Sequence, residues 1–395
     1  MTPDLLPLDG LPDPLTAPAP PPPPLQQVDL FALDQEGLAA QLKAWGEPAF
    51  RAKQLHKWIH ERHAGRFADM TDLPAALRKR LEAEARLGVL EIEAEQRSKD
   101  GTRKRLYRLP DGQLIESVLM PYADGRQTAC ISSQAGCAMA CAFCATGQMG
   151  FARQLSAAEI AEQAWRFDQE LKAEGQRLSN VVLMGMGEPF HNFDAVVSAI
   201  GRLNRDIGIG ARHITVSTVG LVPQIYAFAE LGLQVKLAVS LHSARDEERS
   251  ALMPINRRWP IRELMAACRH YANRSGRRVS FEWALIAGKN DTVEEATRLG
   301  ELLAHMRCHV NLIPLNPTGG YAEAPGSPEA AAAFVATLEA MGVPATVRVR
   351  RGIDIDAGCG QLKSEVMRRQ RAATEATGPT GPTGASGPTG ATPTA

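Results

Sequence analysis

The sequence lacks an excess of charge of either sign, a long apolar run and an apolar leader. Its 395 residues include 44 Lys or Arg against 44 Asp or Glu, so the formal net charge is zero. Composition alone therefore gives no indication of nucleic-acid binding, and any basic surface must be local. The sequence has no run of about 18 apolar residues, which a membrane-spanning helix would need. The N-terminus also lacks the basic segment and apolar core of a secretory signal. We expect a cytoplasmic protein with no membrane partner.

Both ends of the chain also lack the apolar residues that a packed core requires. Residues 1–26 contain the run PAPPPPP, and because proline fixes φ and donates no hydrogen bond we expect a disordered arm. Residues 371–395 contain GPTGPTGASGPTG, with glycine at every third place. This collagen-like period is too short to predict a triple helix, so we expect a flexible tail.

Between these ends, the pattern of apolar residues divides the chain into three parts. Residues 27–97 are predicted to form a small helical accessory domain for RNA binding, because apolar residues in 49–63 recur at helical spacing opposite a basic face. Residues 98–127 alternate polar and apolar side chains around Pro110-Asp111-Gly112, which predicts a β-hairpin linker. Residues 128–370 then alternate short apolar strands with helical patterns.

This alternation predicts an α/β fold in which parallel strands are covered by helices. The expected strands are residues 128–132, 180–185, 213–219, 235–242, 279–286 and 310–315, followed later by 345–350. The expected helices are one that begins at Ser156, with a capping box to Glu159, and residues 193–204, 294–306 and 328–341. Six such units predict a partial (βα)6 barrel, and active sites in such folds gather at the carboxyl ends of the strands.

Three of the seven cysteines stand within eight residues, directly after the first expected strand. Cys137, Cys141 and Cys144 have the spacing C-x3-C-x2-C, with Phe143 before the last cysteine. Thiolates are soft ligands that suit iron–sulfur clusters or zinc. A structural zinc site normally needs four ligands, and no fourth Cys or His stands at finger-like spacing. The triplet therefore favours a cluster with one open iron over a zinc site or three buried core thiols.

The triplet resembles the signature of the radical S-adenosylmethionine (SAM) superfamily. In that superfamily three cysteines hold a [4Fe–4S] cluster, SAM chelates the open iron, and an electron from the cluster cleaves SAM to a 5′-deoxyadenosyl radical. The resemblance implies that Gly187 and Glu188, at the end of the second expected strand, bind the amino group of SAM. Further SAM-contact candidates stand at or near expected strand ends, where a local cap or turn is the alternative: they are Ser217, Ser240, Leu241, His242 and Asn316.

Longer phrases narrow the resemblance to the dual-specificity RNA adenine-C2 methyltransferases. These phrases are ACISSQAGCAMACAFCATGQMGF (129–151), MGMGEPF (184–190), SLHSARDEERSALMPINRRWPI (240–261), NLIPLNP (311–317) and RGIDIDAGCGQL (351–362). The resemblance covers roughly residues 35–370. It implies methylation of carbon 2 of one adenosine in the peptidyl-transferase centre of 23S rRNA and of the adenosine 3′ of the anticodon in some tRNAs.

The same resemblance assigns roles to residues outside the triplet. Carbon 2 of adenine is electrophilic, so the family first places the methyl group on a protein cysteine, a position that Cys359 matches. A first SAM methylates Cys359, a second SAM generates the radical, and Cys130 matches the thiol that releases the product through a transient disulfide. Glu116 matches a proposed general base that removes the C2 proton. The alternatives are a buried small hydrophobe for either cysteine and a solvated strand carboxylate for Glu116.

Two basic stretches, residues 97–108 and 348–371, offer RNA contacts despite the neutral composition. Phosphate contacts there would make binding salt-dependent, and the target adenine would have to be flipped out of folded RNA. A solvated basic face is the alternative for each stretch. The expected partners are 23S rRNA, tRNA and an electron donor such as flavodoxin or ferredoxin, and we expect a monomer. The competing functions are a C8-methylating sister enzyme and a non-catalytic RNA-binding protein that contains zinc.

Overall fold

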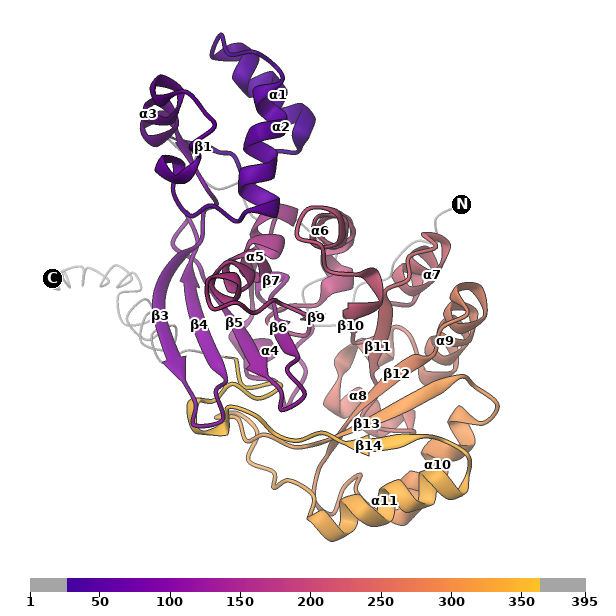
Figure 1. The fold of residues 1–395 in the computed structure, drawn as a ribbon. Coiled ribbons are helices and arrows are strands. Elements are labelled where there is room, and N and C mark those ends of the chain that lie inside the picture. The colour runs from indigo at the N-terminus through magenta and orange to yellow at the C-terminus, as the bar shows by residue number, and fades with distance from the viewer. Residues whose placement is uncertain (1–26, 363–395) are drawn as a thin grey trace, which may run out of the picture. The chain divides into compact units, whose positions relative to one another are not determined.

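A ten-stranded sheet is the centre of the computed structural model, which describes residues 27–362. The expectations for the proline-rich arm and the collagen-like tail therefore lie outside the described residues. The strand order is β14-β13-β12-β11-β10-β9-β6-β5-β4-β3 (Figure 1). None of the helices in residues 27–362 is long and apolar enough to cross a membrane.

One part of this sheet consists of parallel strands. Their order across the sheet is the same as their order in the sequence. They are β6 (Gln127–Cys130), β9 (Asn180–Leu183), β10 (Ile214–Thr218), β11 (Lys236–Ser240), β12 (Val279–Leu285), β13 (Cys308–Pro314) and β14 (Ala345–Val347). Each connection crosses over through a helix, as parallel neighbours require. The predicted partial (βα)6 barrel is confirmed, with β14 as a short additional strand.

The helices follow the outside of the curved sheet in Figure 1. They are α5 (Ala157–Ala173), α6 (Phe193–Arg205), α7 (Val222–Glu230), α8 (Asp246–Leu252), α9 (Ile261–Ser275), α10 (Val293–Leu303) and α11 (Pro328–Ala340). The predicted capping box is present, because Ser156 Oγ accepts from the Glu159 amide at 3.2 Å and Glu159 Oε2 accepts from the Ser156 amide at 2.8 Å. Buried Trp165 of α5 and Trp283 of β12 are the largest side chains of the core.

The other part of the sheet is antiparallel and comprises β3 (Glu91–Arg97), β4 (Arg103–Arg108) and β5 (Leu114–Pro121). The β4–β5 hairpin was predicted from the sequence, and Arg108 pairs with Leu114 across its turn. β3 was not predicted, since the sequence indicated a helical region there. It is an edge strand with nearly every side chain exposed, so it lacks the apolar alternation that identifies a half-buried strand.

The N-terminal module contains α1 (Gln35–Ala44), α2 (Arg51–His56), α3 (Ala75–Glu84) and the short parallel pair of β1 (Val28–Asp29) and β2 (Ala85–Arg86). It is bonded to the helices of the barrel. Trp165 Nε1 donates to the Ile59 carbonyl at 2.9 Å, and Arg202 of α6 donates to the carbonyls of Phe31 and Ala32. These bonds attach the module to α5 and α6, away from the carboxyl ends of the strands.

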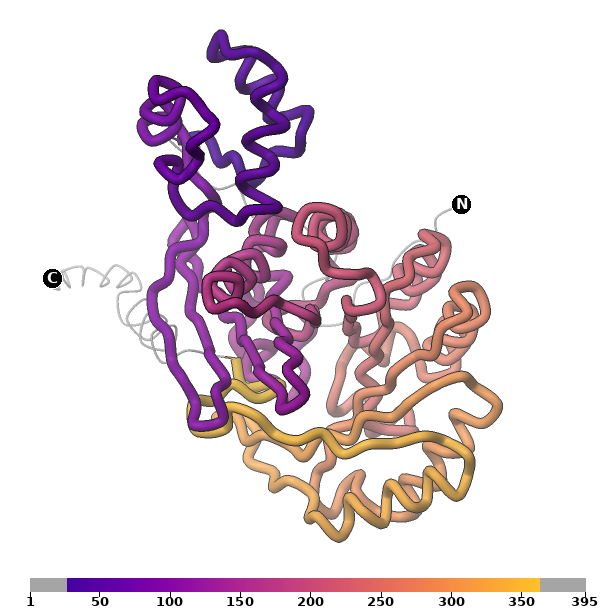
Figure 2. The backbone as a smooth tube through the Cα atoms, in the orientation of Figure 1, coloured from indigo at the N-terminus to yellow at the C-terminus, as the bar shows by residue number. Residues whose placement is uncertain are grey.

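The last described residues return to the antiparallel hairpin formed by β3 and β4. Figure 2 shows this yellow segment beside the purple turn between β3 and β4. The Gly352 amide donates to Asp100 Oδ2 at 3.1 Å, and Ser98 Oγ donates to Asp354 Oδ1 at 2.5 Å. Lys104 Nζ donates to the Asp356 carbonyl at 3.3 Å. The hairpin thus supports the segment that carries Cys359.

Candidate active site

The three cysteines of the triplet lie on the loop between β7 (Gln134–Gly136) and α4 (Ala145–Met149). β7 pairs with β8 (Phe151–Gln154), and the Cys137 amide donates to the Gly150 carbonyl at 2.8 Å, so the loop is closed at its base. Burial raises the pKa of each thiol, and the neighbouring cysteines raise that of Cys141 further. Such thiols stay protonated unless a metal stabilises the thiolate, which makes them suitable metal ligands.

The spacing of these thiols in the fold fits a cluster better than a single ion. In residues 27–362, the group of His, Cys, Asp or Glu side chains whose ligand atoms converge within 4.8 Å is His56, His60 and Asp206, not the triplet. One tetrahedral zinc ion with bonds of about 2.3 Å would draw three sulfurs closer together than that. A [4Fe–4S] cluster binds each thiolate to a different iron, so it accepts more widely separated sulfurs.

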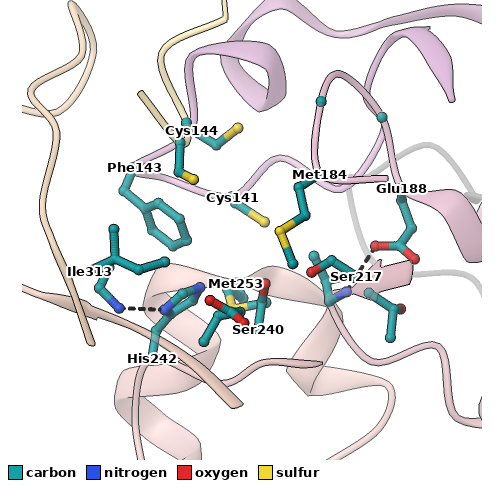
Figure 3. A pocket seen from close by; sticks show the side chains of 18 of the residues that line it. Cys141, Phe143, Cys144, Met184, Glu188, Ser217, Ser240, His242, Met253 and Ile313 are labelled. Carbon is teal, nitrogen blue, oxygen red and sulfur yellow. Dashed lines mark hydrogen bonds between the residues drawn. The ribbon is translucent and has the colours of Figure 1, made fainter. Parts of the chain in front are cut away.

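A cavity of about 160 Å³, called here the carboxyl-end cavity, opens beside Cys141 and Cys144 where the parallel strands end. In Figure 3, Cys141 and Phe143 lie on one side of this space and Ser240 and His242 on another. The lining includes these residues expected from the sequence: Cys141, Cys144, Gly187, Glu188, Ser217, Ser240, His242, Asn316 and Cys359. Parallel strands place their carboxyl ends at one edge, which is why residues so far apart in sequence meet here.

Of the residues expected to bind the cluster or SAM, two do not line this cavity. Cys137 and Leu241 are both buried, and Leu241 is completely so. The Leu241 amide donates to the Glu282 carbonyl at 3.0 Å, and its own carbonyl accepts from Arg249 Nε at 3.2 Å. Leu241 therefore fixes the end of β11 from the core side, while Ser240 and His242 on either side of it face the cavity.

Glu188 is a buried carboxylate with backbone partners. Its Oε1 accepts from the Phe190 amide at 2.9 Å and its Oε2 from the Val219 amide at 2.8 Å, a bond drawn in Figure 3. Burial raises the pKa of Glu188 to about 7 despite these bonds. An ammonium group at this place would offset the burial and favour the ionised form.

Gly187 permits the approach that places Glu188. Its φ is +100°, and a Cβ added there would lie 2.5 Å from Cβ of Gln134. Gln134 Oε1 in turn accepts from the Glu188 amide at 2.7 Å. Only glycine combines this backbone conformation with such a close neighbour.

His242 is a neutral group at the floor of the same cavity. Its Nδ1 accepts from the Ala284 amide at 2.9 Å, and its ring lies 4.7 Å from that of Phe143 in an edge arrangement. Burial, with a smaller contribution from the Arg249 cation, lowers the pKa of His242 to about 3. Because Nδ1 is the acceptor, the ring hydrogen is on Nε2, which leaves that nitrogen as a donor.

Cys130 and Cys359 line a second cavity of about 250 Å³, the thiol cavity. Cys130 ends β6 and is buried, and burial followed by the charge of Cys359 raises its pKa to about 12. Cys359 is exposed and also lines the carboxyl-end cavity. Its loop is fixed on both sides, since Asn316 Nδ2 donates to the Cys359 carbonyl at 3.1 Å and the Ala145 amide donates to the Gly360 carbonyl at 2.8 Å.

Glu116 is buried within β5, with only 1% of its surface exposed. The alternative of a solvated strand carboxylate is therefore wrong. Val118, two residues further along the same face of β5, pairs directly with Cys130, so Glu116 stands on the sheet face that bears this thiol. Glu116 is not among the residues that line the carboxyl-end or thiol cavities.

Two buried residues of the site were not singled out from the sequence. Glu282 of β12 lines the carboxyl-end cavity, and its Oε1 accepts from Asn311 Nδ2 at 2.8 Å. Arg249 of α8 donates to the carbonyls of Val219 and Ser240 at 2.7 and 3.0 Å, which joins the ends of β10 and β11. Charged side chains in an alternating strand or a short helix usually indicate a solvated face, so the sequence offered no signal for either role.

The first basic stretch is largely neutralised by its own neighbours. Arg97 and Arg105 pair with Glu95 at 2.7 and 2.6 Å, and Arg108 pairs with Glu93 at 2.8 Å. Of the second stretch, three arginines line the thiol cavity, namely Arg348, Arg350 and Arg351. The remaining basic residues of that stretch, from Lys363 onward, lie outside the described residues.

Comparison with known proteins places this site in a family. A model described as the ribosomal RNA large subunit methyltransferase N-terminal domain matches residues 28–87, and one described as the radical SAM superfamily matches residues 131–300. A dual-specificity RNA methyltransferase RlmN from Myxococcus xanthus is 51% identical over 346 residues, which cover 87% of this chain and 96% of that protein. The chain belongs to the RlmN family. As a member of the radical SAM superfamily, it uses SAM and a [4Fe–4S] cluster.

Further relatives of the RlmN family agree with this placement. A dual-specificity RNA methyltransferase RlmN from Anaeromyxobacter dehalogenans is 47% identical and covers 85% of this chain and 92% of its own. Among solved structures, the crystal structure of a radical SAM methyltransferase from Sphaerobacter thermophilus has a TM-score of 0.81 and 47% identity. That match covers 85% of this chain and 98% of the other, so it extends over the N-terminal module as well as the barrel.

Proposed function

We propose that this enzyme methylates carbon 2 of adenosine in 23S rRNA and in some tRNAs, through a methyl group carried on Cys359. The observation that carries the proposal is that Cys359 lines two cavities, one with Cys141 and Cys144 and the other with Cys130. A methyltransferase that passes the methyl group directly from SAM would need neither thiol there. The RNA substrate is taken from the relatives, which are named dual-specificity RNA methyltransferases.

The residues of the carboxyl-end cavity would hold the cofactors. Cys141 and Cys144 of this cavity, together with Cys137 of the same loop, would bind the cluster, and Glu188 would accept from the amino group of SAM. When bound, these cofactors supply a methyl group from one SAM and a 5′-deoxyadenosyl radical from the one-electron cleavage of a second. Flavodoxin or ferredoxin is the proposed class of electron donor.

The protein side chains would then carry the methyl group and release the product. Cys359 would lose its thiol proton and its sulfur would bond to the methyl carbon of the first SAM, with S-adenosylhomocysteine as the leaving group. The S-methyl group would give a hydrogen atom to the 5′-deoxyadenosyl radical, and its carbon would then bond to adenine C2. The resulting adduct would return one electron to the cluster, and Glu116 would accept the C2 proton. Cys130, after loss of its thiol proton, would attack the Cys359 sulfur and form a disulfide. The bond from Cys359 to the transferred carbon would break with its electron pair on that carbon, which takes up a proton and becomes the methyl group on C2. A two-electron dithiol reductant must then restore both thiols.

Nucleoside analysis tests this proposal. RNA from a strain that lacks the gene is incubated anaerobically with the reconstituted enzyme, SAM and a reductant, and the digest is compared with 2-methyl- and 8-methyladenosine by chromatography and mass spectrometry. We expect 2-methyladenosine in both the 23S rRNA and the tRNA fractions. 8-Methyladenosine alone would assign the chain to C8 methylation instead. Zinc without iron and sulfide, together with unmodified RNA, would contradict catalysis.

A further inference from the structure

A third cavity, of about 210 Å³, lies inside the barrel at the amino ends of its strands. We call it the cationic cavity and define it by Lys236, Arg277, Arg278, His309 and Arg348, which line it together with Thr215, Ser280, Glu282 and Asn311. Lys236 begins β11, Arg277 and Arg278 precede β12, and His309 is the second residue of β13. Four cationic side chains from three separate segments are therefore gathered around one space.

The positive charge of this cavity is only partly compensated within the described residues, because Glu282 interacts electrostatically with Arg348 but no acid pairs with Lys236, Arg277 or Arg278. Over residues 27–362, its lysine and three arginines form no salt bridge, and Arg277 Nη1 has only a hydrogen bond of 3.4 Å to Gln234 Oε1. Burial and the charges of Arg277 and Arg278 lower the pKa of Lys236, which is the sign of repulsion between like charges. By contrast, the arginines of β4 each face a glutamate. Such an excess of positive charge favours an anionic ligand.

The single acid in the lining is oriented by neighbouring strands. Glu282 is 4% exposed, its Oε1 accepts from Asn311 Nδ2 at 2.8 Å, and its Oε2 has no partner among the described residues. Asn311 is fixed in turn by Thr346 Oγ1, which donates to Asn311 Oδ1 at 3.3 Å. This carboxyl therefore occupies the boundary of the cavity, where its charge acts on Arg348, and it leaves Arg277 and Arg278 without an acidic partner among the described residues.

The cationic cavity adjoins the proposed reaction site. Met184 and Glu282 line both it and the carboxyl-end cavity, and Arg348 lines both it and the thiol cavity. An anion held by Arg277 and Arg278 would thus lie in the same lumen as Cys359, at the opposite end of the strands from the cluster ligands. A nucleotide that is flipped out of folded RNA brings its own phosphates with it into such a lumen.

We propose that the cationic cavity binds a phosphate group of the RNA backbone close to the target adenosine. The proposal rests on the RNA substrate of the proposed function and adds where the backbone is held. Arginine pairs match the geometry of phosphate oxygens, and contacts of this kind fix the register of a nucleic acid without selecting its sequence.

The test uses the cluster-containing enzyme and an RNA hairpin that wild-type enzyme methylates. The Arg277→Gln/Arg278→Gln double variant is compared with Arg274→Gln, an exposed arginine of α9 that pairs with Glu230 at 3.1 Å. We expect the double variant to bind RNA about tenfold more weakly and to lose about 1 to 2 from the slope of log Kd against log salt concentration, as for two lost phosphate contacts. Arg274→Gln should keep the wild-type slope. Circular dichroism and cluster absorbance check that each variant is folded.

A second arm identifies the phosphate and its source. Single neutral methylphosphonate linkages are placed in turn on either side of the target adenosine. We expect one linkage to weaken wild-type binding and to have no further effect in the double variant. Equal sensitivity of both enzymes to every linkage would overturn the proposal, as would a wild-type salt slope in the double variant. If inorganic phosphate stabilises the wild type but not the double variant against heat, and no methylphosphonate linkage weakens binding, the cavity is a site for a free anion. That result would overturn the RNA assignment. Wild-type methylation in the nucleoside assay would be untouched by these outcomes, so the two proposals fail separately.

Discussion

Cys130, at the end of β6, and Cys359, in the loop that returns from β14 to the antiparallel hairpin, line one cavity although most of the barrel separates them in the sequence. The two thiols also interact electrostatically, because the charge of Cys359 raises the pKa of the Cys130 thiol. A thiol with a pKa of about 12 is a poor nucleophile at neutral pH. Cys130 must therefore lose its proton during the proposed reaction.

Cys130→Ala should trap the enzyme on its substrate. Without the second thiol, the bond between Cys359 and the transferred carbon has no nucleophile to break it, so a covalent protein–RNA adduct accumulates. We expect a band shift that survives denaturation and disappears after ribonuclease treatment. Cys268→Ala is the matched control, since Cys268 is also buried with a pKa raised to about 12 but lines none of the three cavities. An adduct in the Cys268 variant, or none in the Cys130 variant, contradicts the assigned role.

Cys359→Ala should abolish methyl transfer and leave the cluster intact. Cys359 is exposed, so its removal creates no core cavity, and we expect a change in unfolding free energy within about 0.5 kcal/mol. Methylated nucleosides are measured by mass spectrometry and iron by chemical analysis. Persistent methylation by this variant would rule out the methyl-cysteine route, and loss of iron would indicate a structural role for Cys359.

Gly358→Ala should slow the reaction through the loop that holds Cys359. A Cβ there would lie 2.6 Å from Gln361 Oε1 and 2.7 Å from Asn316 Nδ2, so Asn316 would have to release the Cys359 carbonyl. We expect at least a tenfold loss of methylation rate with unchanged cluster content. Gly319→Ala is the control, because a Cβ at Gly319 meets nothing within 4 Å. Equal rates for the two variants would show that the Asn316 bond does not position the thiol.

His60 makes stability depend on pH. It is 2% exposed, both ring nitrogens lack partners among the described residues, and burial, followed by the charges of His56, Arg202 and His63, lowers its pKa to about 3. Its pKa in the unfolded chain is the ordinary 6.5. As the pH decreases below that value, the unfolded state takes up the proton and the folded state does not, so the free energy of unfolding decreases. Lowering the pH from 8 to 6 should therefore reduce the free energy of unfolding by about 1 kcal/mol through this histidine.

His60→Phe removes the titrating group. Between pH 8 and 6, the free energy of unfolding of this variant should decrease by about 1 kcal/mol less than that of the wild type. Denaturant unfolding followed by circular dichroism measures it. His213→Phe, at an exposed position, should retain the wild-type pH dependence. A wild-type pH dependence in the His60 variant would contradict the burial of a neutral imidazole at this position.

The sequence predicted the barrel because its strands are short apolar runs separated by amphipathic helices, a pattern that survives without any knowledge of contacts. It failed at β3, whose exposed side chains give no periodic signal, because that strand is defined only by the bonds it makes with β4. The capping box at Ser156 was predictable because both partners are local.

The site was predictable where chemistry is written into short phrases, as in the triplet, Gly187 and Glu188. The cationic cavity was not, since Lys236, Arg277 and Arg348 stand in different segments and only the register of parallel strands brings them together. Conversely, the basic run at 97–108 was conspicuous in sequence, yet glutamates of β3 and α5 neutralise much of it. Charge density along a chain is a poor guide to charge density in space.

The position of Cys359 also affects when a newly made molecule becomes competent. Translation produces Cys137, Cys141 and Cys144 early, together with the strands that surround them, whereas β14 and the Cys359 loop come after α11 ends at Ala340. A nascent chain at that stage has the three proposed cluster ligands but not Cys359, the proposed methyl acceptor. The hydrogen bonds from the Ala145 amide to the Gly360 carbonyl and from Asn316 Nδ2 to the Cys359 carbonyl can form only after this last segment has been synthesised. The ribosome, whose RNA is the proposed substrate, thus completes each copy before that copy is able to modify it.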